Sequence, residues 1–383
     1  MKLSTWQKIN LALSLAVLGI FMALLFVSGS SRIFSFININ ETYVKEASFW
    51  EKKDLGVQCT LCPSNCFLQE GTKGLCRVRM NRGNKLYTQV YNQPVSINVD
   101  PIEKKPIFHM LPGSTILSIS TVGCPLACTF CQNWTISQEY PEKTAAPHLM
   151  TPAEIVQLAL DNQIPSIAFT YGEPIIYYEY MRDVAQLARQ KGLSNVMVTS
   201  GYINPKPLLE IAQYFDVVKV DLKGIDQEFY RQEVGGYLDS VLDTLALLKK
   251  LNILVEVVNL VVPGRNDSDG DIDKLSKWVR EKMGQDTPLF FSRFHPDYKL
   301  SNLPATPLQT LEHARDIAIK NGLQFVYLGN VPGHAGENTY CPEDGTLLIE
   351  RNGYQILQNN LKDGKCPVCG KKIPGFWHKK SYR

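Results

Sequence analysis

The 383-residue sequence predicts an α/β protein: a partial TIM-like (β/α)6 barrel, with an N-terminal membrane helix and a small cysteine-rich module at each end. Short runs rich in Val and Ile alternate with amphipathic helical patterns from residue 116 onward. Strands that are apolar on both faces and alternate with helices are typical of a buried parallel sheet with right-handed crossovers. The ten cysteines fall into three groups, one inside the predicted barrel and one on each side of it.

The predicted order is an anchor over 1–30, a linker over 31–57, an N-terminal cysteine-rich module over 58–112, a core over 113–335 and a C-terminal module over 336–383. Strands are expected over 116–121, 166–171, 195–200, 217–222, 253–262, 289–294 and 325–328. Helices are expected over 151–162, 178–191, 205–214, 238–251, 271–283 and 308–320. The first helix opens with the capping pattern Thr-Pro-x-Glu, and the second stops at a glycine.

The N-terminal run LALSLAVLGIFMALLFV, residues 11–27, contains no charge and follows Lys2 and Lys8. It is compatible with a cleaved signal peptide or with an uncleaved membrane anchor. Because no clear A-x-A cleavage site follows, we predict an anchor and a single-pass membrane protein. The lysines favour an amino end in the cytoplasm and a body outside.

The composition is that of a folded globular protein, with 44% hydrophobic and 20% charged residues. The net charge of +3 is too small to indicate a polyanionic partner, so no nucleic acid is expected.

The central cysteines, Cys124, Cys128 and Cys131, have the spacing C-x3-C-x2-C directly after the first predicted strand. A disulfide set needs an even number of thiols, and a tetrahedral zinc site usually takes a fourth ligand. Three thiolates can bind three irons of a 4Fe-4S cluster and leave the fourth iron free for an outside ligand. The sequence therefore predicts a metal centre with one open position.

Polar residues follow other predicted strands, at the edge where sites gather in parallel α/β folds. They are Glu173, Ser200, Asp221, Arg265 and His295. Together with Phe130 before the last central cysteine, these motifs resemble the radical S-adenosylmethionine superfamily. Tyr171-Gly172-Glu173-Pro174 resembles its GGEP segment, and Asp221-Leu-Lys223 resembles the D-x-K motif of glycyl-radical-enzyme activases such as those of pyruvate formate-lyase.

The resemblance implies a 4Fe-4S cluster on Cys124, Cys128 and Cys131, with S-adenosylmethionine as the outside ligand. It implies that a low-potential electron donor drives cleavage to a 5′-deoxyadenosyl radical, which takes hydrogen from an unknown substrate, for instance a protein as in the activases. The cofactor-binding residues would be Phe130, Gly172, Glu173, Ser200, Asp221, Lys223 and His295. Arg265 would lie on the substrate or cofactor side.

The N-terminal thiols, Cys59, Cys62, Cys66 and Cys76, have spacings that suit a zinc site or a second 4Fe-4S cluster, with zinc slightly favoured. Two disulfides become the better interpretation only if this segment is extracytoplasmic.

The C-terminal cysteines form two knuckles, Cys341-Pro-Glu-Asp344-Gly and Cys366-Pro-Val-Cys369-Gly, in which Asp344 takes the place of an expected cysteine. The four side chains either bind zinc more weakly than four thiols would, or the knuckle has lost its metal. The stretch from Cys59 to Trp377 resembles the AmmeMemoRadiSam-system radical enzyme.

Two other functions compete with a radical enzyme: a membrane-tethered iron–sulfur electron-transfer protein without radical chemistry, and a zinc-ribbon adaptor for nucleic acid. A simple carrier leaves Glu173 and Asp221 without a role. The radical chemistry also bears on location, because an open-iron cluster needs a strong reductant and reduced thiols. This requirement outweighs the N-terminal lysines, and the catalytic body is predicted to face the cytoplasm.

Overall fold

The computed structural model describes residues 44–143 and 149–378. Its centre is an eight-stranded sheet with the strand order β14-β13-β12-β11-β10-β9-β8-β7. The strands are β7 (Ser96–Pro101), β8 (Thr115–Ser120), β9 (Ser166–Phe169), β10 (Ser194–Thr199), β11 (Val217–Asp221), β12 (Leu254–Val261), β13 (Leu289–Arg293) and β14 (Val326–Gly329). All neighbouring pairs from β8 to β14 are parallel, as the alternation of strands and helices predicts.

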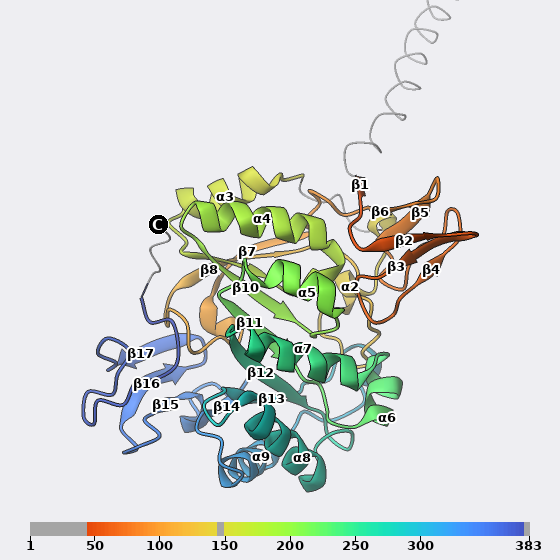
Figure 1. Ribbon diagram of the computed structural model, residues 1–383. Helices are drawn as coiled ribbons and strands as arrows, with labels where there is room; N and C mark the ends of the chain where they lie inside the picture. The colour runs from red at the N-terminus through yellow and green to blue at the C-terminus, as the bar shows by residue number, and fades with distance from the viewer. Residues whose placement is uncertain (1–43, 144–148, 379–383) are drawn as a thin grey trace, which may run out of the picture. The chain divides into compact units, whose positions relative to one another are not determined.

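The main helices are α3 (Pro152–Asp161), α4 (Tyr178–Gln190), α5 (Pro205–Ala212), α7 (Leu238–Lys250), α8 (Asp269–Trp278) and α9 (Leu308–Lys320). Figure 1 shows them lying along one face of the sheet, each between two successive strands of the chain. The predicted cap of the first helix is present: Glu154 N donates to Thr151 Oγ1 at 3.3 Å, and Thr151 N donates to Glu154 Oε2 at 2.7 Å. The predicted α/β fold, with six strand-helix units and a seventh parallel strand, is confirmed.

Shorter elements complete the chain. The α-helical ones are α2 (Trp134–Ser137) and α6 (Gln227–Phe229), and α6 and α8 continue into π-helical turns over Tyr230–Val234 and Val279–Met283. The 3-10 turns are Ile102–Lys104, Pro141–Lys143, Pro174–Tyr177, Tyr298–Leu300 and Ala335–Glu337.

Strand β7 is an addition to the predicted sheet, and it pairs antiparallel with β8 along its whole length. The segment contains no long apolar run, and three of its six residues are exposed. The sequence of β7 therefore carries no strong strand pattern and falls within the predicted N-terminal cysteine-rich module. The segment is an edge strand because it pairs with β8.

Small sheets lie before and after the main sheet. The N-terminal ones have the orders β1-β6-β5 and β2-β3-β4, and the C-terminal one has the order β15-β16-β17. Their strands are β1 (Lys45–Glu46), β2 (Trp50–Lys53), β3 (Gly56–Cys59), β4 (Phe67–Leu68), β5 (Arg79–Arg82), β6 (Lys85–Thr88), β15 (Thr339–Tyr340), β16 (Leu347–Asn352) and β17 (Gln355–Asn359). In Figure 1 the red-orange N-terminal strands and the blue C-terminal strands lie at different parts of the main sheet. The boundaries of the predicted domains stay predictions.

The structure corrects the predicted localisation. Within residues 44–143 and 149–378, no helix is both long enough and apolar enough to cross a membrane. The prediction of a single-pass membrane protein with its body facing the cytoplasm is therefore wrong by this finding. The predicted anchor, residues 11–27, lies outside the described residues.

Candidate active site

The central cysteines lie in the loop between β8 and α2. Gly123 begins this loop with φ +99°, a left-handed conformation that favours glycine, and its N–H donates to the Ile136 carbonyl at 2.9 Å. The N–H of Ala127 donates to the Val234 carbonyl at 2.9 Å, and the N–H of Thr129 to the Glu233 carbonyl at 2.8 Å. These bonds tie the loop to α2 and to the turn after α6, so that its shape is set by backbone contacts.

The three thiols differ in exposure. Cys128 is buried, whereas Cys124 and Cys131 are partly buried. Burial raises the pKa of Cys128 to about 12, and burial followed by the nearby Glu173 raises the pKa of Cys124 well above its usual value. Thiolates at these positions need a compensating positive charge, which a bound metal centre supplies.

Glu173 follows β9 and is 4% exposed. Its carboxylate accepts hydrogen bonds from Thr199 Oγ1 at 2.6 Å, from Ser200 N at 2.8 Å and from the Ser200 hydroxyl. Burial raises the pKa of Glu173, while these donors lower it. The end of β10 therefore holds the carboxylate in one orientation at the predicted edge of the sheet.

Asp221, the last residue of β11, pairs with two lysines. Lys219 lies two residues earlier on the same strand, and Lys223 Nζ lies 3.4 Å from Asp221 Oδ2. Burial would raise the pKa of Asp221, but the two ammonium groups lower it below its usual value. The carboxylate therefore stays ionised and brings both cations to one place.

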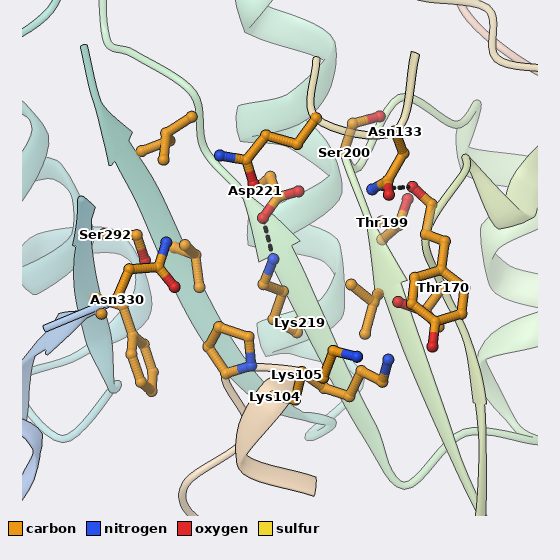
Figure 2. A pocket seen from close by; sticks show the side chains of 18 of the residues that line it. Lys104, Lys105, Asn133, Thr170, Thr199, Ser200, Lys219, Asp221, Ser292 and Asn330 are labelled. Carbon is orange, nitrogen blue, oxygen red and sulfur yellow. Dashed lines mark hydrogen bonds and ion pairs between the residues drawn. The ribbon is translucent and has the colours of Figure 1, made fainter. Parts of the chain in front are cut away.

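A cavity of about 500 Å³ joins these groups. Its lining contains the predicted residues Cys124, Cys128, Phe130, Cys131, Gly172, Glu173, Ser200, Asp221 and Lys223. Figure 2 shows Asp221 and Lys219 in its middle, Ser200 and Asn133 toward one end, and Lys104 and Lys105 toward the other. Residues that are distant in the chain thus line one space.

Two predicted residues lie outside this lining. His295 Nδ1 lies 2.8 Å from Gln132 Nε2, next to the central loop, and Arg265 Nη1 lies 3.1 Å from a Glu233 oxygen. Both are near the loop but are not among the residues that line the cavity.

Several lining residues were not among the predicted site residues, among them Lys105, Lys219 and Tyr171. Lys105 Nζ lies 2.6 Å from Asp100 Oδ2 and 4.0 Å from the centre of the Tyr171 ring, and burial lowers its pKa to about 8. Tyr171 has φ +63°, which is rare for a side chain of this size. The sequence signal for Lys219 was a lysine inside an otherwise apolar strand, V-V-K-V-D. The signal for Tyr171 was a tyrosine at the position where the GGEP motif has its first glycine.

The N-terminal thiols belong to one small module. Cys59, Cys62 and Cys76 are buried, and Cys66 is partly buried. The Cys59 N–H donates to the Cys66 carbonyl at 2.9 Å. Burial first, and then the neighbouring Cys76 and Cys59, raise the pKa of Cys62 to about 12. The predicted four-thiol set is thus gathered in one module.

The C-terminal knuckles converge more tightly. The ligand atoms of Cys341, Asp344, Cys366 and Cys369 all lie within 4.8 Å of one another. Cys341 and Cys366 are buried, whereas Asp344 and Cys369 are exposed. This geometry suits a single metal ion.

Comparisons with known proteins agree with this arrangement. Residues 118–279 match the family model of the radical SAM superfamily. An uncharacterised protein of Methanocaldococcus jannaschii is 46% identical over 333 residues, which are 86% of this chain and 99% of that protein. The 4-hydroxyphenylacetate decarboxylase activating enzyme of Clostridium scatologenes is 25% identical and covers 45% of this chain and 56% of its own. The pyruvate formate-lyase 1-activating enzyme of Escherichia coli K12 is 22% identical and covers 54% of this chain and 89% of its own.

Proposed function

The chain belongs to the radical S-adenosylmethionine superfamily, and from that premise we propose that Cys124, Cys128 and Cys131 hold its 4Fe-4S cluster and that the adjoining cavity holds S-adenosylmethionine and the substrate. The single observation that carries the proposal is the joint lining of one cavity by three thiols, Glu173 and Asp221. When bound, the cluster supplies an electron that breaks the sulfonium C–S bond of S-adenosylmethionine and yields a 5′-deoxyadenosyl radical.

The donor set fits these cofactors. Three thiols from one loop line the cavity, which suits a four-iron cluster with one iron left for another ligand. A sulfonium ligand with an amino and a carboxyl group needs both an anion and a cation from the protein. Glu173 supplies the anion, and Lys223 beside Asp221 supplies the cation.

We assign each polar residue a holding role. Glu173 would accept a hydrogen bond from the amino group of S-adenosylmethionine, with Thr199 and Ser200 fixing its orientation. Lys223 would face the carboxylate. Phe130, which stacks on Phe229 with ring centres 6.0 Å apart, would lie against the adenine. Gly172 lets the chain approach closely, because a Cβ there would lie 3.0 Å from Ser120 Oγ. The role of His295 stays a prediction.

The substrate class is suggested by the relatives that are named activating enzymes. We infer that this enzyme acts on a protein, one segment of which reaches the cavity and gives up a hydrogen atom. The competing function, electron transfer without radical chemistry, is not favoured, because it leaves the buried Glu173 and its hydrogen-bond donors without a role.

The test is anaerobic reconstitution of the full chain with iron and sulfide, followed by reduction with dithionite and an assay for 5′-deoxyadenosine and methionine. Wild-type protein should form both products, and Cys124→Ala should form neither. The chain has no cysteine outside the three groups that could serve as a neutral control. The comparison variant is therefore Cys62→Ala, which changes an N-terminal thiol and keeps the three central thiols. If the wild-type cluster is reduced but no 5′-deoxyadenosine forms, the protein is an electron carrier and the proposed function is wrong.

A further inference from the structure

We propose that Cys341, Asp344, Cys366 and Cys369 bind one zinc ion, and that this ion holds the β16–β17 hairpin as a wall of the cavity and so slows the escape of S-adenosylmethionine. The claim about S-adenosylmethionine rests on the proposed function, whereas the claim about the ion and the hairpin does not. All four side chains belong to the described part of the C-terminal module, residues 336–378.

The four ligand atoms are already placed for one ion. Cys341 Sγ lies 3.6 Å from Cys369 Sγ, and Cys366 Sγ lies 3.5 Å from Asp344 Oδ2. Tetrahedral zinc with Zn–S bonds of about 2.3 Å places its thiolates about 3.8 Å apart. The observed separations therefore match a single ion.

Both knuckles are rigid turns. The N–H of Gly345 donates to the Cys341 carbonyl at 2.9 Å, and the N–H of Gly370 donates to the Cys366 carbonyl at 3.0 Å. Thr346 N donates to Asp344 Oδ1 at 3.0 Å, which orients the carboxylate and leaves its other oxygen toward Cys366. Such a contact to the ligand fixes its direction.

The hairpin lies between the two knuckles in the chain. Strand β16 begins at Leu347, directly after the first knuckle, and the second knuckle follows β17. The turn between the strands contributes Gly353 and Tyr354 to the cavity lining. One ion bound to both knuckles would therefore join the two ends of the segment whose tip faces the cavity.

The hairpin is attached to the barrel by buried polar contacts. Arg351 is 2% exposed and donates to the Phe108 carbonyl at 3.1 Å and to Thr339 Oγ1 at 2.8 Å. Glu337, itself in the cavity lining, accepts a hydrogen bond from Gly353 N at 3.0 Å. A shift of the hairpin would thus break contacts at the cavity wall.

The apolar core of the C-terminal module is small, which makes a metal ion important for its order. The hydrophobic cluster that it shares with the barrel includes Leu348, Ile349 and Ile373 from the module, and two further members are the thiols of Cys341 and Cys366. Modules of this size usually depend on a metal or disulfides, and metal binding then contributes directly to local folding.

The experiment compares Asp344→Ala, Asp344→Cys and the matched control Glu343→Ala in the full chain. Glu343 lies in the same turn and is exposed, pairs with Lys371 at 3.2 Å, and is outside the ligand set. After a chelator challenge, zinc retention should fall by about tenfold or more in Asp344→Ala, rise in Asp344→Cys and stay unchanged in the control.

Two further measurements test the wall. Hydrogen exchange over residues 347–359 should speed up in Asp344→Ala, and labelled S-adenosylmethionine bound to the oxidised enzyme should dissociate faster when it is chased with an excess of unlabelled S-adenosylmethionine. Absence of zinc from both wild type and Asp344→Cys would contradict the proposed zinc site. Unchanged hydrogen exchange after zinc loss would contradict the proposal that the ion holds the hairpin in place. If wild type bound no S-adenosylmethionine, the proposed function and the retention claim would fall together, whereas zinc content and exchange would still decide the site.

Discussion

Arg77 of the N-terminal cysteine-rich segment donates a hydrogen bond from Nη1 to the carbonyl oxygen of Cys124, the first central cysteine, at 3.5 Å. Its Nη2 donates to Gln138 Oε1 at 3.0 Å, directly after α2. The backbone of the preceding residue, Cys76, packs against Gly123. The N-terminal thiols and the central thiols are therefore mechanically joined, and a change at this contact should affect both.

We expect Gly123→Ala to disturb this contact. A Cβ at position 123 would lie 2.5 Å from the Cys76 carbonyl oxygen and 2.8 Å from Val78 Cγ1, and the residue has φ +99°. The variant should lose several kcal/mol of stability, about 2–4, because backbone strain adds to overpacking. The effect is measured by the midpoint temperature of thermal unfolding and by the iron content after reconstitution. Both values should be lower in the variant than in wild type.

Gly83→Ala is the matched control, since Gly83 also has a positive φ, +61°, but a Cβ there meets nothing within 4 Å. It should cost about 1 kcal/mol from backbone strain alone and leave the iron content unchanged. Equal losses in both variants would show that the contact with Cys76 is unimportant.

Cys62→Ala should remove the metal of the N-terminal module. Because four thiols at these spacings favour zinc, zinc should fall by about one ion per chain, while the iron of the central site remains. Metal analysis together with acid-labile sulfide decides the identity. A loss of iron and sulfide instead would show a second cluster, and no loss of any metal would contradict a metal site at these thiols.

Glu173→Gln should weaken S-adenosylmethionine binding. Loss of a charge-assisted hydrogen bond costs about 1.5–3 kcal/mol, which corresponds to a roughly 10- to 100-fold higher Kd. Equilibrium dialysis on the oxidised enzyme measures it. The control is Glu256→Gln, which removes another fully buried carboxylate that lies outside the cavity lining. An unchanged Kd in Glu173→Gln would contradict the assigned role.

Glu256→Gln should also change how stability depends on pH. Burial raises the pKa of Glu256 from 4.5 to about 7, although the N–H groups of Phe108 and His109 donate to it at 3.0 Å. The folded chain therefore holds this proton more tightly than the unfolded chain. Its stabilising contribution is complete below pH 4.5 and is lost as the pH rises through 7.

Wild type should consequently lose up to about 3 kcal/mol relative to the variant between pH 5 and pH 8. Thermal midpoints of both proteins at matched pH values measure this difference. A difference that stays constant across that range would show that Glu256 is ionised throughout.

Much of the fold and part of the site were determined by local sequence. Runs of Val and Ile alternating with amphipathic helices predict parallel strands, because strands that are apolar on both faces are typical of a sheet covered by helices. The central thiols were found by their C-x3-C-x2-C spacing and Glu173 by the resemblance of its motif to the GGEP segment. Their positions after predicted strands supported both, because the carboxyl ends of parallel strands meet at one edge. The C-terminal knuckles were visible as C-P-x-C-G repeats, including the departure at Asp344.

Only the tertiary structure decided the rest. Strand β7 exists because it pairs with β8, and Lys105 reaches the cavity because the segment after β7 turns back under Tyr171. Tyr354 becomes a cavity residue through a hairpin that is distant in the chain from the central thiols. Such contacts join residues from separate parts of the sequence, and their free energy depends on packing partners that no local pattern contains.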